Sequence, residues 1–292
     1  MGQGTFTKIA QLAANELGLN FNKIKVTATN TEKVPNTSAS AASATTDLNG
    51  GAVLNAIDKI KSNINTFVKR KYNINTDFPE YKNELVKYKN RTFKFTDLIM
   101  DAYLNRVSLS STGFYSTPKI YFDKNNFKGN PFFYFAYGAA VSEVIIDTLT
   151  GENKILRVDI LHDVGKSINE GIDMGQIEGG FIQGMGWLTM EEVKWKSNGQ
   201  LTTYSPSTYK IPAVNDMPEK FYAKIFKQGK NIENVVNKSK TTGEPPLMLA
   251  MSVFFAIKEA ISSISNYKKS PELDAPATAE KILLAINRIT EK

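Results

Sequence analysis

Gly243-Glu244-Pro245-Pro246 precedes an almost wholly apolar run, Leu247-Met248-Leu249-Ala250-Met251-Ser252-Val253-Phe254-Phe255-Ala256-Ile257. The two prolines lack backbone donors and disfavour helical geometry in the residue before them, so we expect Glu244 to be extended. Pro246 suits a first helical turn, and the run after it is apolar on every face, which predicts a helix covered by protein. The stretch therefore predicts one carboxylate fixed at the positive end of a buried helix.

Two interpretations of Glu244 follow from this stretch. The side chain either caps a core helix or acts on a polar ligand, and for an isolated Glu-Pro pair capping is the simpler interpretation. Three other segments favour the second one. They are Met1-Gly2-Gln3-Gly4, the Ser-, Thr- and Ala-rich stretch 34–46, and the Gly- and Gln-rich stretch 175–186.

The first two of these segments each lead into a predicted helix. Gly2-Gln3-Gly4 opens onto residues 5–17, which have helical spacing of apolar residues and end at Gly18. A glycine loop that enters a helix presents unpaired amides to an anion or a carbonyl. Stretch 34–46 precedes an amphipathic pattern over 47–60, and its small side chains allow a ligand to approach the main chain closely.

The third segment has glycines four residues apart, at Gly175 and Gly179 and again at Gly180 and Gly184. On a helix this spacing makes a smooth face, against which another backbone or a flat ligand can pack. A dinucleotide fingerprint is the rival interpretation. The glycine spacing differs from that motif, and no strand, turn and helix followed by an acidic residue is evident.

Composition excludes several kinds of site. The 292 residues contain no cysteine and one histidine, so disulfides, iron–sulfur ligation and the usual zinc sites cannot be built from this chain. Any metal must bring its own ligands. His162 stands at a strand end beside Asp163, and a structural role is favoured over a catalytic one.

Charge and hydropathy bear on partners and location. The formal net charge is +7, yet the lysines are scattered and no basic cluster is interleaved with stacking aromatics, so we expect no nucleic-acid partner. No apolar run is judged long enough to cross a bilayer, and no signal segment is evident at the N-terminus. We therefore expect no membrane partner and a cytoplasmic location.

The remaining patterns predict an α+β fold with mixed sheets and packed helices. Stretches 132–146 and 154–162 predict a hairpin, as do 187–195 and 200–204, and 21–29 and 221–226 predict strands. Helices are expected over 96–106, with Thr96 as N-cap, and over 278–289. The lysine-rich segment 67–91 is interpreted as a surface excursion. Two closely associated lobes are expected, 1–110 and 111–292.

Taken together, ordered matches along nearly the whole chain carry a resemblance to a known family. The sequence resembles the molybdopterin-binding large subunit of xanthine dehydrogenase, in its bacterial form, within the xanthine oxidase and aldehyde oxidase family. The matching segments are Met1-Gly2-Gln3-Gly4, Ala41-Ala42-Ser43, Gly113-Phe114-Tyr115, Tyr134-Phe135-Ala136-Tyr137-Gly138, Gly175-Gln176-Ile177-Glu178-Gly179, the stretch 206–212, Gly243-Glu244-Pro245-Pro246 and the stretch 274–278.

The resemblance implies roles for particular residues. Glu244 would be the general base of an oxidative hydroxylation. The cofactor-binding residues would be Gly2, Gln3, Ala42, Ser43, Thr45 and Gln176. The cofactor would be molybdopterin, whose dithiolene sulfurs hold the molybdenum, so no protein ligand to the metal is expected.

The resemblance also implies what lies outside this chain. The chain looks like the C-terminal part of a larger subunit, with the substrate-orienting residues in the half upstream of it. FAD and 2Fe-2S clusters are expected on other chains or segments. The expected reaction is the hydroxylation of xanthine or hypoxanthine in purine catabolism. A hydroxylase of aldehydes or other N-heterocycles, and a catalytically incompetent fragment or assembly partner, are the alternatives.

Overall fold

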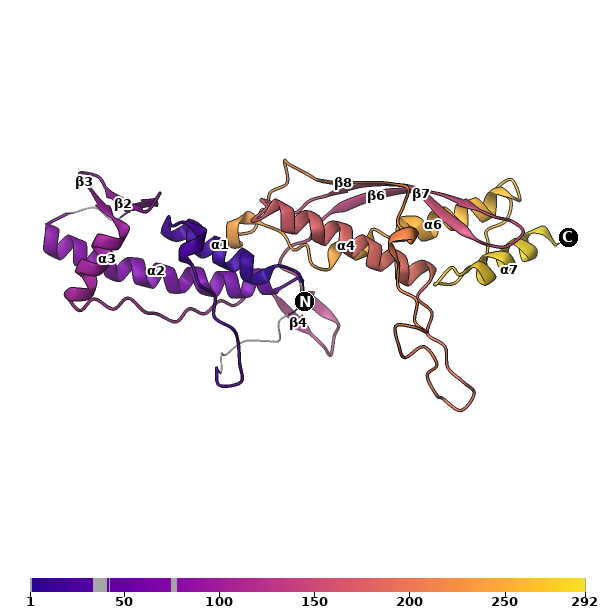
Figure 1. Cartoon of the computed structure of the whole chain (residues 1–292), viewed down its shortest axis with the longest axis horizontal. Coiled ribbons are helices and arrows are strands. Elements are labelled where there is room, and N and C mark those ends of the chain that lie inside the picture. The colour runs from indigo at the N-terminus through magenta and orange to yellow at the C-terminus, as the bar shows by residue number, and fades with distance from the viewer. Residues whose placement is uncertain (1, 34–40, 42, 75–77, 292) are drawn as a thin grey trace. The chain divides into compact units, whose positions relative to one another are not determined.

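The structure, a computed structural model, describes residues 2–33, 41, 43–74 and 78–291. The chain divides into two compact units, and each has its own hydrophobic core. Unit 1 comprises Met1–Phe135 and Asn231–Ser239, and unit 2 comprises Ala136–Lys230 and Lys240–Lys292. Figure 1 labels the longer elements of both units. A division into cofactor-binding lobes at residue 110 stays a prediction.

Unit 1 is built on three α-helices and a small antiparallel sheet. The helices are α1 (Thr5–Leu17), α2 (Thr45–Tyr72) and α3 (Phe95–Leu104), with a short 3-10 helix η1 (Phe21–Lys23) and a second, η3 (Val236–Lys238). The sheet has the order β1 (Glu80–Lys82), β2 (Leu85–Tyr88), β3 (Arg91–Lys94), and a separate hairpin joins β4 (Tyr121–Asp123) to β5 (Lys128–Asn130).

The predicted surface excursion over 67–91 is wrong. Phe67 and Val68 lie on the last turns of α2, and Val86 and Tyr88 lie on β2, all in the core of unit 1. Arg70 and Lys71 after the first pair are exposed, and on β2 the exposed Lys87 separates the buried Val86 from Tyr88. The high lysine content therefore marks the outer faces of a helix and a strand, whose inner faces are apolar.

Two further expectations for unit 1 are also wrong. Residues 21–29 form η1 and then an irregular segment rather than a strand, and no described strand pairs with them. Helix α3 begins at Phe95, one residue before the expected start, with Lys94 as N-cap. The amide of Phe95 donates to the carbonyl of Glu84 at 2.8 Å, which sets this start.

Unit 2 is a mixed three-stranded sheet covered by helices. Strands β6 (Gly138–Ile146) and β7 (Asn153–His162) form the predicted antiparallel hairpin, and β8 (Lys220–Ile225) pairs with β7 in parallel. The helices are α4 (Glu170–Thr189), α5 (Pro245–Met248), α6 (Met251–Ser263) and α7 (Ala279–Thr290), and η2 (Val214–Asp216) is a 3-10 turn. Together the two units confirm the α+β class and the presence of a mixed sheet.

One face of this sheet carries the core of unit 2. Side chains of β6, β7 and β8 pack with Phe181 of α4 and with Val253, Ile257 and Ile261 of α6. Figure 1 shows α4 and α6 below the same sheet. Thr278 caps α7 by accepting a hydrogen bond from the amide of Lys281, as the sequence predicts. The second predicted hairpin forms near its turn, where a bridge joins Trp195 to Leu201 and the amide of Thr202 donates to the carbonyl of Lys194, whereas 187–189 belong to α4.

The apolar segment after Glu244 differs from expectation in two ways. It forms two helices, α5 and α6, and it is covered on one side only, since Met248, Met251 and Phe255 are exposed. The 19 residues Pro245–Ser263 also have the length and hydropathy of a membrane span, which corrects the expectation that no run is long enough. Because Val253, Ile257 and Ile261 are fully buried against the sheet, we assign α6 as a core helix of unit 2.

Candidate active site

In unit 1, Gly2 and Gln3 lie at the entrance of α1. Gly2 has φ +78° and Gly4, the N-cap, has φ +65°, which glycine adopts without strain. Among the described residues no side chain caps α1. Gly2 is exposed and Gln3 half-buried. The first amides of α1 are therefore available to a ligand, as predicted.

Ser43 and Thr45 lie at the start of α2. Ala44 is the N-cap, and no side chain in the described ranges accepts from the first amides of this helix. Thr45 is buried, and its hydroxyl donates to the carbonyl of Ala41. The Ser43 hydroxyl oxygen is buried, and no described residue hydrogen bonds to it. Ala42 lies outside the described residues.

Helices α1 and α2 lie side by side and run in the same direction. A Cβ at Gly50 would meet the side chain of Leu12 at 3.0 Å, which marks how closely the helices pack. Near the beginnings of the helices Lys8 attracts Asp47, and near the end of α1 Lys61 pairs with Glu16. The two uncapped N-termini thus open at the same end of the pair, where two helix dipoles favour an anion.

Asp47 is the titratable group nearest these N-termini whose pKa is shifted. Burial raises the pKa of Asp47, and the hydrogen bond from Tyr134 at 2.5 Å and the charge of Lys8 oppose that rise. Burial, followed by the charge of Asp47, likewise raises the pKa of Tyr115. The hydrogen bond from Tyr134 therefore ties the first turn of α2 to the segment before β6.

In unit 2, α4 and the segment that leads into α5 lie against each other. The hydroxyl of Thr242 donates to a carboxylate oxygen of Asp173, in the first turn of α4, at 3.1 Å. One turn after Gln176, a Cβ at Gly180 would meet Pro246 at 3.1 Å, and a Cβ at Gly184 would meet the carbonyl of Leu247 at 2.3 Å.

These contacts show that 242–250 runs along α4 in the direction of the helix. Glu244 lies between Thr242, which contacts Asp173, and Pro246, which packs against Gly180. Three, four and seven residues apart on a helix share one face, so Asp173, Gln176 and Gly180 point toward this segment. The structure thus brings Glu244 alongside the turn of α4 that carries Gln176. Gly2, Gln3, Ser43 and Thr45 belong to unit 1.

Glu244 itself is the N-cap of α5, with φ −120° and ψ −38°, so the expectation of an extended residue is wrong. Its carbonyl accepts from the amide of Leu247 at 3.1 Å, and this turn outweighs the extended preference that a following proline imposes. The Glu244 side chain is exposed and makes no capping hydrogen bond within the part of the chain that the structure describes. The interpretation as a helix cap therefore lacks its hydrogen bond.

The smooth glycine face predicted for 175–186 has two different parts. Gly180 and Gly184 are needed for packing, because the backbone of α5 fills the space of a side chain there. Beyond the adjacent backbone of α4, no described atom lies within 4 Å of a Cβ placed at Gly175 or Gly179. The glycine motif is thus confirmed as a backbone-packing face in its second half and is open in its first half.

His162 is fully buried beside Gly138, and burial is the largest cause of the lowered pKa of this histidine. Its Nδ1 has no hydrogen-bond partner among the described residues. The folded state therefore resists protonation below about pH 6.5, the ordinary histidine value, whereas the unfolded chain takes up the proton. The stability that a neutral His162 contributes is present above that pH and is lost as the pH falls.

We predict that His162→Leu flattens the pH dependence of stability between pH 7 and 5. The parent protein should lose about 1.4 kcal/mol of stability on acidification for each unit by which the pKa of His162 is lower in the folded than in the unfolded state, and the variant should not show this loss. Thermal unfolding of both proteins across this range measures it, and His162 is the single histidine of the chain. Parallel curves for the two proteins would assign the acid sensitivity to carboxylates instead.

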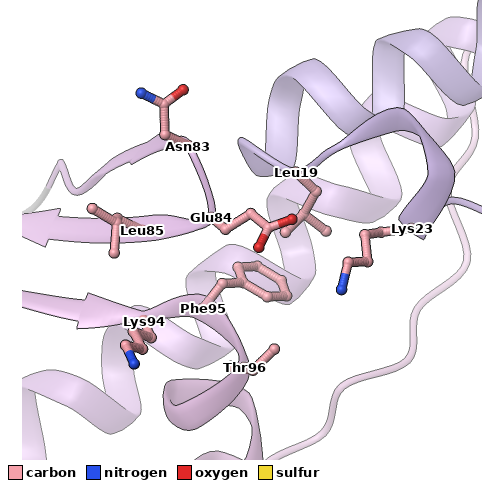
Figure 2. Close-up of a pocket in the computed structure, with 8 residues that line it drawn as sticks. All are labelled: Leu19, Lys23, Asn83, Glu84, Leu85, Lys94, Phe95 and Thr96. Carbon is pink, nitrogen blue, oxygen red and sulfur yellow. The ribbon is translucent and has the colours of Figure 1, made fainter.

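One cavity of unit 1 contains none of the predicted site residues. It has a volume of about 410 Å³ and lies where the turn after α1 meets the β1–β2 hairpin and the start of α3. Figure 2 shows the Glu84 carboxylate near Leu19 and the Phe95 ring. The amide of Glu84 donates to the carbonyl of Gly18 at 2.7 Å, so the cavity follows from the packing of α1 against the hairpin.

Sequence reasoning missed the polar residues that hold the Glu244 segment. Asp173 and Thr242 are both buried, as is the side chain of Lys240, which pairs with Asp163. A signal was present for Asp173, since it lies between Ile172 and Met174 in a glycine-rich helix, and an aspartate that becomes buried there must find a partner. Its partner Thr242 is 69 residues away, and no local pattern could identify it.

Comparison with known proteins identifies the domain. A family model described as the molybdopterin cofactor-binding domain matches residues 1–218 of the 292. The chain belongs to this family. The xanthine dehydrogenase/oxidase of Mus musculus is 46% identical over 97% of this chain and 20% of its own length. The xanthine dehydrogenase of Oryza sativa subsp. japonica is 43% identical over 100% of this chain and 21% of its own length.

The resemblance to the xanthine dehydrogenase/oxidase family is thereby confirmed, and the molybdopterin-binding chain spans about a fifth of the length of these relatives. Solved structures share its fold. The reconstituted CO dehydrogenase from Oligotropha carboxidovorans has a TM-score of 0.81, 20% identity, and is matched over 99% of this chain and 34% of its own. Quinoline 2-oxidoreductase from Pseudomonas putida 86 has a TM-score of 0.80 and 22% identity, and the match covers 98% of this chain and 35% of that protein's chain.

Proposed function

We propose that this molybdopterin-binding chain supplies the general base, Glu244, of a molybdenum hydroxylase that acts on xanthine or hypoxanthine. The observation that carries the proposal is the corner at Glu244. Thr242 and Pro246 fix the main chain on both sides of Glu244, and the exposed carboxylate makes no capping hydrogen bond to any described residue. A base must be ionised and rigidly placed while its oxygens remain available to the reacting group.

Gly2, Gln3, Ala42, Ser43, Thr45 and Gln176 are the proposed cofactor-binding residues. The buried Ser43 oxygen without a described partner, beside two uncapped helix N-termini, suits the oxygen-rich, anionic pterin phosphate. Gln176 supplies amide groups that hydrogen bond, on the face of α4 toward Glu244. When bound, the molybdenum cofactor supplies the redox chemistry of the hydroxylation. Glu244 accepts the proton that the reaction releases.

The remainder of the enzyme is proposed to lie outside this chain. The chain covers a fifth of its xanthine dehydrogenase relatives, which leaves room for an upstream half of the molybdenum subunit and for FAD and 2Fe-2S segments. We propose that the residues that orient the purine belong to that upstream half, and that 1–110 and 111–292 are two lobes of the cofactor-binding region. By this proposal the chain alone has no turnover.

Related hydroxylases provide the second candidate function. A quinoline oxidoreductase and aldehyde oxidoreductases share the fold with this chain, at identities of 20–22%. The named relatives at 42–46% identity are xanthine dehydrogenases, and this difference favours a purine substrate.

A substrate panel on the complete enzyme separates the two candidates. We expect kcat/KM for xanthine and hypoxanthine to exceed the value for quinoline and for aromatic aldehydes by at least about 10²-fold, because a site that hydrogen bonds a substrate rejects analogues that lack those groups. A preference for an aldehyde or quinoline would overturn the assignment to purines and would leave Glu244 as the proposed base.

A further inference from the structure

The main chain on the N-terminal side of Glu244 is held by polar contacts of two residues, Lys240 and Thr242. The Lys240 side chain, 7% exposed, pairs with Asp163 at 2.5 Å, and the amide of Lys240 donates to the carbonyl of Val164 at 2.7 Å. Two residues further on, the Thr242 hydroxyl donates to Asp173 at 3.1 Å. Thr242 is 4% exposed and Asp173 is 3% exposed.

Asp173 is itself fixed within unit 2. It lies in the first turn of α4, and its second carboxylate oxygen accepts a hydrogen bond from the hydroxyl of Ser167 at 2.5 Å. A buried carboxylate that accepts from hydroxyl donors on both oxygens has little freedom to rotate, and hydrogen bonds to a charged acceptor are stronger than neutral ones. Asp173 therefore anchors Thr242 to the rigid backbone of α4.

The C-terminal side of Glu244 is held by apolar packing. Pro246 is buried against Gly180, and the carbonyl of Leu247 lies so close to Gly184 that a Cβ there would approach it to 2.3 Å. Glu244 is thus the middle one of three residues between Thr242 and Pro246, which are both held against α4. Because the Glu244 carboxylate is exposed and uncapped, its position depends on these anchors.

We propose that Thr242 and Asp173 are positioning residues for the Glu244 carboxylate. This inference rests on the proposed function, because placement of the carboxylate matters to turnover only if Glu244 is the base. Without the Thr242 hydroxyl, Gly243 allows the corner to move, since glycine resists a change of backbone conformation least. A displacement of about 1 Å at a reacting group costs up to about 10²-fold in rate.

The test compares variants of the complete enzyme. Thr242→Val removes the hydroxyl at nearly constant volume, and Thr242→Ser retains it. We expect Thr242→Val to lower kcat by at least about 10-fold with little change in KM, and Thr242→Ser to stay within about 3-fold of the parent enzyme. Molybdenum content should be unchanged in both.

Thr189→Val is the matched control. Thr189 is a buried threonine on the same helix, and its hydroxyl donates to the carbonyl of Met185 at 2.7 Å, far along α4 from Asp173. This variant loses a buried hydroxyl hydrogen bond and should lower the melting temperature without lowering kcat. If Thr242→Val behaves like Thr189→Val, or if Thr242→Ser loses activity equally, the positioning role is wrong.

Two further variants keep the outcomes distinct. If Glu244→Gln retains turnover, the proposed function fails, whatever Thr242→Val does. If Glu244→Gln is inactive while Thr242→Val matches the control, only the positioning inference fails. Should Thr242→Val not accumulate as folded enzyme, Asp173→Asn is measured by the same criteria. Failure of both variants to fold would assign the pair to stability alone and overturn the inference.

Discussion

Glu244→Gln is expected to lower turnover of the complete enzyme by at least about 10²–10⁴-fold, the range that general base catalysis contributes. Glutamine preserves the length and shape of the side chain but cannot accept a proton at neutral pH. Because the carboxylate makes no capping hydrogen bond to a described residue, the substitution should leave α5 and its packing against α4 intact. Steady-state rates together with molybdenum content measure the two effects separately.

Glu178→Gln is the control for this experiment. Glu178 is an exposed glutamate on α4, the helix against which the Glu244 segment packs, and it has no proposed role, so its substitution should leave both rate and molybdenum content unchanged. Loss of molybdenum together with activity in Glu244→Gln would assign Glu244 to the cofactor cradle or to helix capping. Retained turnover would require another base.

Where the local pattern was strong, the sequence predicted the elements of both units. The helix over 5–17 ends at Gly18, which has φ +63°, and the hairpin of 138–162 forms about the predicted turn. Thr278 caps the last helix. In each case the residues that decide the structure are neighbours in the chain, so capping, turn geometry and alternation are enough to predict them.

Where partners are distant, the sequence was insufficient. Leu85-Val86-Lys87-Tyr88 alternates like a strand, but only contact with α2 and α3 shows that Val86 and Tyr88 face a core. Residues 21–29 alternate as well and find no described partner strand. An alternating pattern therefore predicts a half-buried strand only when the fold supplies a neighbour for it.

The candidate site divides in the same way. Glu244, Gln176 and the glycine loops could be proposed from motifs and from the family resemblance. The backbone conformation of Glu244 could not be predicted, because a hydrogen bond to its carbonyl and contacts with α4 outweigh the local preference of a residue before proline. Asp173 and Thr242 could not be paired either, since a contact between residues 69 apart depends on the whole fold of unit 2.

Gly184→Ala is expected to destabilise unit 2 by about 1–3 kcal/mol, the usual cost of an overpacked contact. The added methyl would lie 2.3 Å from the carbonyl of Leu247 and 2.9 Å from the Cβ of Ala250. Both are on rigid main chain or directly attached to it, so the strain cannot be relieved by a side-chain rotation. The segment after Glu244 must move away from α4, and kcat should fall along with the unfolding midpoint.

We predict that Gly179→Ala, on the same helix, has the opposite effect on stability. Beyond the adjacent backbone of α4, no described atom lies within 4 Å of the new methyl group, so the variant gains helix propensity alone and should be more stable by about 0.5–1 kcal/mol. Thermal and denaturant unfolding of the two variants and the parent protein measure the sign of each change in the free energy of unfolding. Equal destabilisation by both would show that α4 tolerates no side chain on either half of its glycine face. Equal stabilisation would show that α5 does not pack against Gly184, and the fixed corner at Glu244 would then lose its C-terminal anchor.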